Sequence, residues 1–165
     1  MAQSIQIFVW ATVLLLIHLS VQILRGGVRT VIAICEKAKL LIGDNAGISN
    51  STIICHESIT IGNNVQIGAN NIIYDSDMHS VEYEDRIHVP DVKIKKAPVI
   101  IDDGAWICGH CIILKGVHIG KRSVVAAGSV VTSDIPDDEL WGGNPCRFIR
   151  KINSQYASIK EKEEC

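Results

Sequence analysis

Aliphatic residues recur every six positions over much of the chain. Starting at residue 101, six consecutive positions of this step are filled without a slip by Ile101, Ile107, Ile113, Ile119, Val125 and Val131. Four places after five of them come residues that are small or modest in size: Ala105, Cys111, Val117, Ser123 and Ser129. A six-residue step fits neither the helical period nor long strand alternation, but it suits short strands joined by turns in a parallel solenoid. The pattern therefore predicts an all-β solenoid, in which each repeat forms one side of a coil and directs one aliphatic and one small side chain inward.

The same step occurs upstream of this run. It comprises Ile42, Ile48 and Ile54 and, after one extra residue, Ile61, Ile67 and Ile73. Glycine, asparagine and aspartate residues stand between these positions, and they tolerate the positive φ that tight corners require. We expect them to form the corners of the coils.

The register fails between Ile73 and Ile101. Residues 79–98 are charged and contain Pro90 and Pro98, so we expect an extruded loop there. Long excursions from compact folds are usually functional or disordered.

A helix is predicted at the C-terminal end. Asn144 and Pro145 suit an N-cap and a first helical position, and apolar residues follow at helical spacing. These are Phe148, Ile149, Ile152, Tyr156 and Ile159. The expected organisation has three parts. A hydrophobic N-terminal segment (residues 1–24) is followed by a β-helix domain (25–146) that carries the loop (79–98), and a C-terminal helix with a tail (147–165) ends the chain.

The N-terminal segment differs from the rest of the chain. Five of the nine Leu lie between Leu14 and Leu24, and the first charged side chain is Arg25. Twenty residues at 1.5 Å each would cross a hydrocarbon core, but several polar residues dilute the stretch. Two interpretations stay open: membrane association through residues 1–24, or a buried cap on the domain. A cleaved signal peptide is disfavoured because no basic residue precedes the segment, so we expect a cytoplasmic protein with or without membrane association.

Composition narrows the class of protein. The chain has 27 Ile and 15 Val against 9 Leu, which argues against an all-helical fold. Its 16 Lys and Arg against 18 Asp and Glu give a net charge of −2, so no nucleic-acid partner is expected. The six cysteines are expected to be reduced thiols, and the Cys108–Cys111 pair to be a packing feature, because no second pair follows it for zinc.

Four short motifs carry a family resemblance, together with the six-residue repeats. They are Tyr74-Asp75-Ser76-Asp77-Met78-His79, Ala105-Trp106-Ile107-Cys108-Gly109, Ala126-Ala127-Gly128-Ser129-Val130-Val131-Thr132 and Gly143-Asn144-Pro145-Cys146-Arg147. From about Leu40 to Ile152 the chain resembles the hexapeptide-repeat O-acetyltransferases, near the maltose, galactoside and polysaccharide acetyltransferases. The resemblance implies a left-handed parallel β-helix, an exception to right-handed crossovers, assembled as a homotrimer with active sites between subunits.

The resemblance also implies roles for individual residues. His79 takes the place of the general base and Asn71 that of an acceptor-binding asparagine, while Trp106 lines the site. The contacts with acetyl-CoA would fall on Gly109, Ala127, Thr132, Ser133 and Arg150. Ser133 departs from the lysine that many relatives have there, which removes one expected phosphate contact. An acidic residue that the maltose-type enzymes supply from an N-terminal helical region has no counterpart either, so the acceptor stays open.

The chemistry explains why a histidine is needed. A sugar hydroxyl is a very weak acid, and a neutral imidazole can remove its proton as the oxygen attacks the thioester of acetyl-CoA. Asp75 and Asp77 lie two and four residues before His79, so in an extended strand all three share a face. One of the two carboxylates could then orient the imidazole or the sugar.

Other functions remain as alternatives. The acceptor could be an amino acid, an amino-sugar or an antibiotic, with acetylation at nitrogen, or the coils could form a non-catalytic scaffold. Zinc carbonic anhydrases on similar coils need three converging histidines. His110 and His118 are eight residues apart and do not match that ligand pattern, so no metal is expected.

Overall fold

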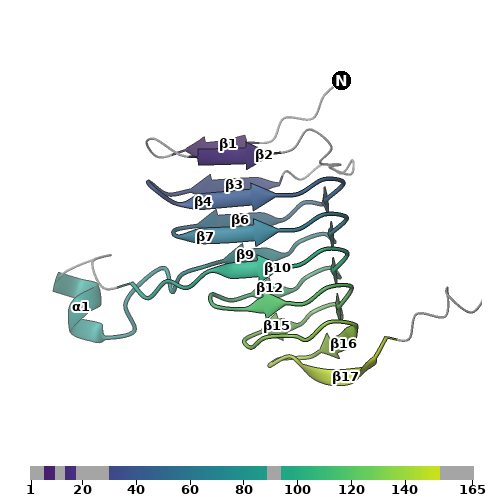
Figure 1. Ribbon diagram of the computed structural model, residues 1–165. Coiled ribbons are helices and arrows are strands. Elements are labelled where there is room, and N and C mark those ends of the chain that lie inside the picture. Colours follow the sequence, from purple (N-terminus) through teal and green to yellow (C-terminus); the bar gives the residue numbers. More distant parts are fainter. Residues whose placement is uncertain (1–5, 10–13, 18–29, 89–93, 153–165) are drawn as a thin grey trace, which may run out of the picture.

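The computed structural model describes residues 6–9, 14–17, 30–88 and 94–152, and it is a solenoid with three sheets, which are parallel except at the last strand of the third (Figure 1). The first sheet has the order β1-β3-β6-β9-β12-β15, with β1 (Gln6–Val9), β3 (Val31–Ile34), β6 (Thr52–Cys55), β9 (Ile72–Tyr74), β12 (Ile112–Ile113) and β15 (Val130–Val131). The second has the order β13-β10-β7-β4-β2, with β2 (Leu14–Ile17), β4 (Lys39–Ile42), β7 (Ser58–Ile61), β10 (Val99–Ile101) and β13 (His118–Ile119). The third has the order β17-β16-β14-β11-β8-β5, with β5 (Gly47–Ile48), β8 (Gln66–Ile67), β11 (Trp106–Ile107), β14 (Val124–Val125), β16 (Glu139–Gly142) and β17 (Arg147–Lys151).

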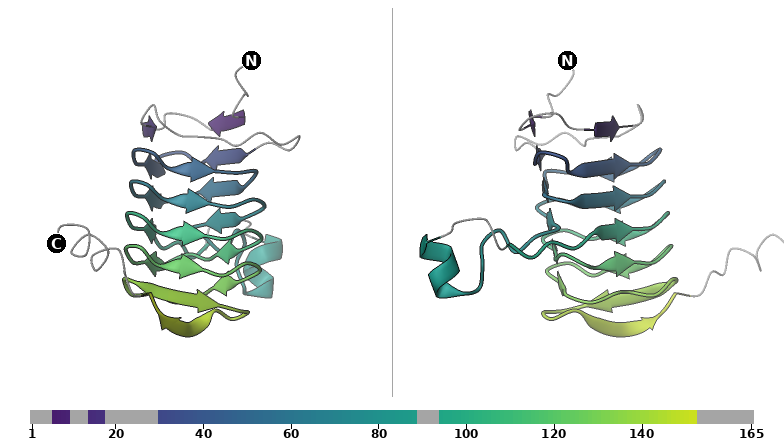
Figure 2. Two further views of the ribbon diagram at one scale, coloured as in Figure 1. Left: turned by 90° about the vertical axis from the view of Figure 1, so that its right-hand side faces the viewer. Right: turned by 60° about the vertical axis from the view of Figure 1, so that its left-hand side comes forward.

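The chain visits the three sheets in turn, so each circuit forms one coil, and the two views of Figure 2 show the coils stacked along one axis. Successive coils pair in parallel and in register: Ile61 lies beside Ile101, which lies beside Ile119. Identical positions therefore stack, which explains why a sequence repeat is needed to build the core.

The predicted inward positions are confirmed over the C-terminal run. All six aliphatic residues from Ile101 to Val131 are buried, and so are the five small residues that alternate with them. Corners are closed by residues with positive φ, among them Asn64, Asn70, His110, Gly104 and Gly128. The solenoid prediction is confirmed, and the corner prediction is confirmed at Asn64, Asn70, Gly104 and Gly128, whereas His110 shows that other residue types also occupy corners.

One upstream position was predicted wrongly. Ile54 is only half-buried and faces outward, whereas its neighbours Ile53 and Cys55 are fully buried. The register pairs Ile53 with Ile73, so the step from Ile48 is five residues instead of six. The step from Ile53 to the inward Ile61 is then eight residues, so the repeat is irregular on both sides of this strand.

The break in the repeat is an excursion from the solenoid, as predicted. We use the name excursion for residues 75–98, which lie between β9 and β10; residues 89–93 are outside the described part. The excursion carries α1 (Tyr83–His88), which projects sideways from the stack in Figure 1 and buries none of its residues. Its two ends are joined by an antiparallel bridge between Ser76 and Lys96.

The predicted start of a C-terminal helix is wrong within the described residues. Arg147–Lys151 forms strand β17, which pairs antiparallel with β16 and closes the last coil as a hairpin. Phe148 packs edge-on against Trp141, with 6.3 Å between ring centroids. Pairing with an existing sheet edge outweighs the helical spacing of the apolar residues here. Residues 153–165 lie outside the described part.

The described part of the N-terminal segment adds to the stack. β1 pairs in parallel with β3, and β2 with β4. This pairing fits the interpretation of residues 1–24 as a cap, and the remainder of that segment lies outside the described residues. Among the residues that the structure describes, no helix has the length and apolar character needed to cross a lipid bilayer.

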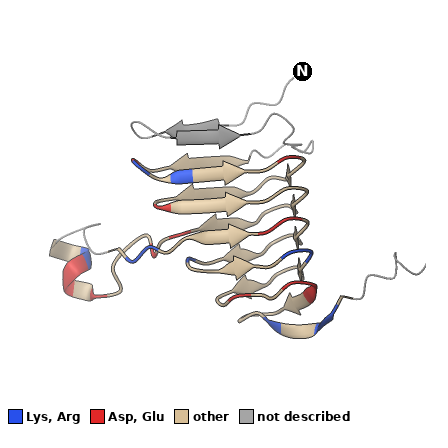
Figure 3. Ribbon diagram, viewed as in Figure 1, with Lys and Arg blue, Asp and Glu red and all other residues tan. Residues whose placement is uncertain are grey.

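Charged side chains avoid the strands of the first sheet. Figure 3 shows acidic and basic residues on the turns, the excursion and the C-terminal hairpin. Five cysteines are free thiols, including Cys108 and Cys111, as predicted; Cys165 lies outside the described part.

Candidate active site

His79 lies near the start of the excursion, exposed on a tight turn. Its backbone N–H donates to the carbonyl oxygen of Asp77 at 2.7 Å, and Met78 between them has φ +63°. A hydrogen bond from residue i+2 to residue i around a positive φ defines the rarer, strained form of γ-turn. The general-base candidate is therefore presented on a constrained piece of backbone.

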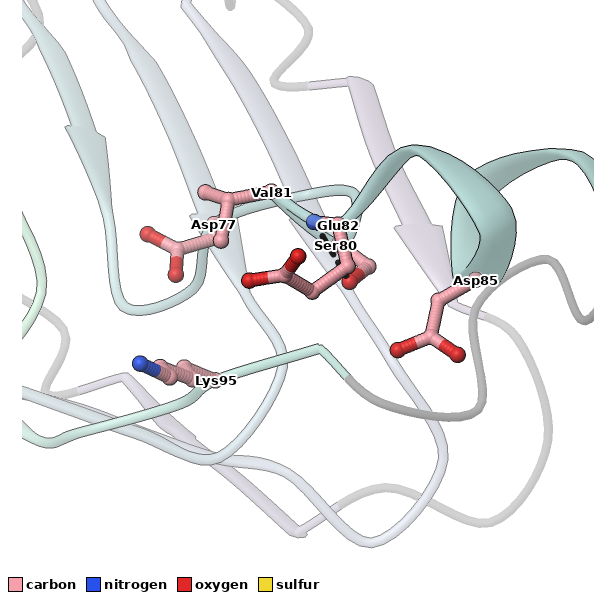
Figure 4. Close-up of a pocket in the computed structure, with 6 residues that line it drawn as sticks. All are labelled: Asp77, Ser80, Val81, Glu82, Asp85 and Lys95. Atoms are coloured by element: carbon pink, nitrogen blue, oxygen red, sulfur yellow. Dashed lines mark hydrogen bonds between the residues drawn. The ribbon is translucent and has the colours of Figure 1, made fainter.

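A pocket of about 170 Å³ lies on the excursion next to His79 in sequence. It is lined by Asp77, Ser80, Val81, Glu82, Asp85 and Lys95. Figure 4 shows Lys95 on the chain segment opposite Asp77 and Glu82. The pocket therefore offers both hydrogen-bond acceptors and a donor.

Asp77 is tied to the next coil. Its carboxylate forms an ion pair with the ammonium of Lys115, which follows β12, and its backbone N–H donates to the carbonyl oxygen of Lys95 at 3.0 Å. The two side chains of the ion pair are only 23% and 28% exposed. The Asp77 carboxylate is thus paired with Lys115, and its predicted role of orienting the imidazole or the sugar stays a prediction.

Asp75 has a structural role in place of the predicted contact with imidazole or sugar. Its side chain is fully buried, and its carboxylate accepts hydrogen bonds from three consecutive backbone N–H groups of the coil above: His56, Glu57 and Ser58, at 2.7 to 2.8 Å. The extended segment that the prediction assumed ends at Tyr74, where the chain turns outward. Asp75 caps a turn instead of facing the site.

Asn71 also has a structural role, and its side chain is buried instead of facing a site for the acceptor sugar. It is 1% exposed, and its amide is fully engaged: Nδ2 donates to the carbonyl oxygen of Gly68 at 2.8 Å, and Oδ1 accepts from the N–H of Cys111 at 2.6 Å. Its backbone N–H donates to Ser51 Oγ. Asn71 is one of the inward residues that link successive corners.

Trp106, Gly109 and Ala127 lie together on one edge of the solenoid. Trp106 projects from the third sheet and is 51% exposed. Gly109 and Ala127 follow in the turns that lead from the third sheet to the first; we call these turns, at residues 49–51, 68–71, 108–111 and 126–129, the Gly109 corner. Ala127 is exposed, and a side chain at Gly128 would meet nothing within 4 Å. This edge is therefore accessible.

The other predicted contacts lie elsewhere. Thr132 and Ser133 are exposed in the turn from the first sheet to the second, on the same edge as the excursion; we call these turns, at residues 56–57, 75–98, 114–117 and 132–134, the His79 corner. Arg150 lies in β17 beside Leu140. Within one chain the first sheet separates the two corners, so His79 is not brought together with Trp106, Gly109 and Ala127.

Burial disfavours the thiolate form of the two thiols near this edge. Burial raises the pKa of Cys108, and the backbone of Ala127 offsets this only in part. Burial likewise raises the pKa of Cys111. A protonated thiol is a poor nucleophile, so the chemistry of this edge does not depend on the Cys108–Cys111 pair.

Sequence reasoning missed two groups of residues. Lys115 is 38 residues from Asp77, and no local pattern marks their contact. A ladder of corner side chains was also missed: Asn50 donates to Asn70, whose Nδ2 lies 3.2 Å from His110 Nε2. The signal for the ladder was present, because these residues occupy equivalent places in successive coils. In residues 30–88 and 94–152, no group of three His, Cys, Asp or Glu side chains lies close enough to hold a metal ion.

Comparison with known proteins finds similar chains among the acetyltransferases. Residues 98–133 match the family model described as hexapeptide repeat of succinyl-transferase. The chain is 41% identical over 106 residues to the galactoside O-acetyltransferase of Escherichia coli, covering 64% of this chain and 50% of that protein. The chain spans about half the length of the curated relatives it matches.

Two solved structures resemble it closely. One is a hexapeptide-repeat acetyltransferase of Vibrio cholerae complexed with acetyl coenzyme A, with a TM-score of 0.64 and 40% identity over 70% of this chain and 61% of that one. The other is a maltose O-acetyltransferase of Clostridium difficile, with a TM-score of 0.61 and 31% identity over 90% of this chain and 68% of that one.

Proposed function

The chain belongs to the hexapeptide-repeat acetyltransferase family, and from this membership we propose that it transfers the acetyl group of acetyl-CoA to a hydroxyl group of a sugar or polysaccharide precursor. The observation that carries the proposal is the likeness to galactoside and maltose O-acetyltransferases over the coils that bear the Gly109 and His79 corners. A left-handed winding of the coils of this chain is part of the same proposal.

His79 acts as the general base in this proposal. Its neutral imidazole takes the proton of the acceptor hydroxyl as that oxygen attacks the carbonyl carbon of the thioester. The tetrahedral intermediate then expels the sulfur of CoA, which takes the proton back from the imidazolium. The exposed position of His79, which comes directly before the pocket residues Ser80 and Val81 in the chain, supports this role, because the acceptor has to reach the ring from solvent.

Acetyl-CoA binds along the Gly109 corner in this proposal. Exposed small residues there, Ala127 and Gly128, leave the backbone accessible to a long, thin ligand. Trp106 offers a half-exposed aromatic surface on the same edge. The Vibrio cholerae relative was solved with acetyl coenzyme A, which supports this ligand for the family.

The site is completed by a second copy of the chain. The outer face of the first sheet is mostly apolar and uncharged. Val31, Thr52, Ile72, Ile112 and Val130 lie side by side across five strands, and Ala33, Ile54 and Tyr74 form a second row. In the single chain, the side chain of Ile72 at the centre of the first row is 38% exposed. Parallel sheets are usually covered on both faces, and an apolar patch of this kind marks an interface.

A ring of three copies covers this face and also joins the two corners. In a closed ring, each copy meets its neighbours through two different surfaces. The first sheet lies between the His79 corner and the Gly109 corner, so a neighbour packed on it brings the His79 corner of one copy beside the Gly109 corner of the next. We therefore propose a homotrimer with one site at each of its interfaces.

The test is turnover by the purified protein with acetyl-CoA and a panel of sugars, the acetylated product being detected by mass spectrometry. His79→Ala should lower kcat by about 10²–10⁴-fold, the usual contribution of a general base. His88→Ala is the matched control, because His88 is an exposed histidine of the same excursion. Unchanged turnover in His79→Ala would remove His79 from the mechanism, and acetylation of amines but not of sugars would replace the proposed acceptor class.

A further inference from the structure

The turn that presents His79 is held by contacts from outside itself. A residue other than glycine with φ +63° persists only where its surroundings fix it. Ser76 is fully buried, and its hydroxyl accepts a hydrogen bond from the N–H of Met78 at 3.3 Å and lies 2.9 Å from His56 Nδ1. These contacts fix the first half of the turn.

The second half depends on Asp77. The Asp77 carbonyl oxygen is the acceptor for the N–H of His79, so any movement of Asp77 moves His79. The Asp77 side chain is bound to Lys115, and the turn that contains Lys115 is itself joined to the far end of the excursion: the N–H of Gly116 donates to the carbonyl oxygen of Ala97 at 3.1 Å. Lys115 therefore connects the His79 turn to a rigid coil.

The Lys115–Asp77 ion pair is better shielded from water than the Arg122–Asp138 ion pair. Its side chains are 28% and 23% exposed, whereas those of Arg122 and Asp138 are 58% and 41% exposed. Exposed ion pairs contribute little, and shielding from water strengthens the attraction. The Lys115–Asp77 pair is therefore better suited than the Arg122–Asp138 pair to holding a backbone turn in place.

We propose that Lys115 and Asp77 form a clamp that positions His79, holding the Asp77–His79 turn so that the imidazole meets the acceptor hydroxyl in one orientation. The clamp rests on the proposed function of His79 as general base. Lys115 and Asp77 are positioning residues: neither touches the reacting atoms, and both act through the backbone of the turn.

The kinetic test compares Lys115→Ala, Lys115→Arg and the double variant Asp77→Asn/Lys115→Ala with the natural protein. Lys115→Ala should lower kcat between about 10- and 100-fold, since misplacement of a catalytic group on the scale of 1 Å has effects of this size, and should leave KM for acetyl-CoA within about twofold. Lys115→Arg keeps the charge and should restore most of kcat. The double variant should lose no more than the worse single variant, because both substitutions break one contact.

Arg122→Ala is the matched control, since it breaks an ion pair of the same kind at a different corner, and it should leave kcat unchanged. The clamp is overturned if Lys115→Ala leaves kcat unchanged, if only KM rises, or if the losses in the double variant add.

A readout that does not depend on turnover separates the clamp from the proposed function. The ring signals of His79 in a carbon–proton NMR spectrum are assigned by their absence in His79→Ala. Lys115→Ala should shift or broaden them, and Arg122→Ala should not. If the natural protein acetylates no acceptor, the proposed function fails while this spectrum still decides the clamp, and unchanged His79 signals in Lys115→Ala overturn it.

Discussion

Replacing Asp75 with asparagine distinguishes a structural carboxylate from a catalytic one. Oδ1 of Asp75 accepts from the N–H of His56, and Oδ2 accepts from the N–H groups of Glu57 and Ser58. An amide offers one acceptor atom and one donor group. In either orientation the NH2 group faces at least one of these backbone donors, so one or two hydrogen bonds are lost.

The expected loss follows from these contacts. A hydrogen bond to a charged group contributes about 1.5–3 kcal/mol, so Asp75→Asn should lower the free energy of unfolding by about 1.5–3 kcal/mol for one lost bond and up to about 6 kcal/mol for two. A domain of this size has about 5–15 kcal/mol in all, so the change is large.

Urea unfolding followed by far-UV circular dichroism measures it, at one fixed chain concentration because association affects stability. Asp134→Asn is the control: Asp134 Oδ1 caps only the N–H of His118 at an exposed corner, and an amide oxygen can replace it. If Asp75→Asn unfolds at the same urea concentration as the natural protein but has lost acetyl transfer, Asp75 acts in the chemistry and its structural assignment is wrong.

Three further predictions follow from the same contacts. Asn71→Ala leaves the N–H of Cys111 unpaired, whereas the Gly68 carbonyl keeps the hydrogen bond from Ser51 Oγ, so the change should cost about 1–3 kcal/mol in urea unfolding; a loss below about 0.5 kcal/mol would contradict the structural role. Burial, with the Asp75 carboxylate beside it, raises the pKa of Cys55 from 9.0 to about 12, so this thiol stabilises the fold fully below pH 9 and loses that contribution as the pH rises toward 12. Unfolding free energies measured across that range should fall less in Cys55→Ala, and an equal fall in both proteins would refute the assignment. Ile72→Glu should dissociate the trimer in light scattering, whereas Lys39→Glu, on the second sheet, should not; a trimeric Ile72→Glu protein would place the interface elsewhere.

The core could be predicted from the sequence because stacking makes it periodic. Every coil places equivalent residues at equivalent depths, so the run from Ile101 to Val131 identified the inward positions by arithmetic alone. The same arithmetic failed at Ile54, because the steps before and after Ile53 are five and eight residues long, and spacing alone did not reveal which of the two adjacent isoleucines faces inward. The hairpin strand Arg147–Lys151 was missed because its apolar residues have helical spacing, and that spacing does not reveal that the edge of the third sheet is open for pairing.

The site was harder to predict because short spacings do not reveal burial. Asn71 comes four places after Ile67, which is the register of the small inward residues, and Asp75 comes two places after the inward Ile73. Both therefore carried a signal of burial that the family motif obscured. The pairing of Lys115 with Asp77 carried none, since it depends on how the excursion returns to the coils.

The central claim is that each site takes His79 from one chain and the Gly109 corner from another, and mixing two inactive proteins tests it directly. His79→Ala lacks the base, and Ala127→Trp blocks the corner where acetyl-CoA binds. When the two are unfolded together and reassembled in equal amounts, about a quarter of the interfaces combine an intact His79 with an intact Ala127 if chains associate at random in a three-membered ring. The account predicts that acetyl transfer returns to about a quarter of that of the natural protein treated in the same way, and a mixture as inactive as its two components would contradict it.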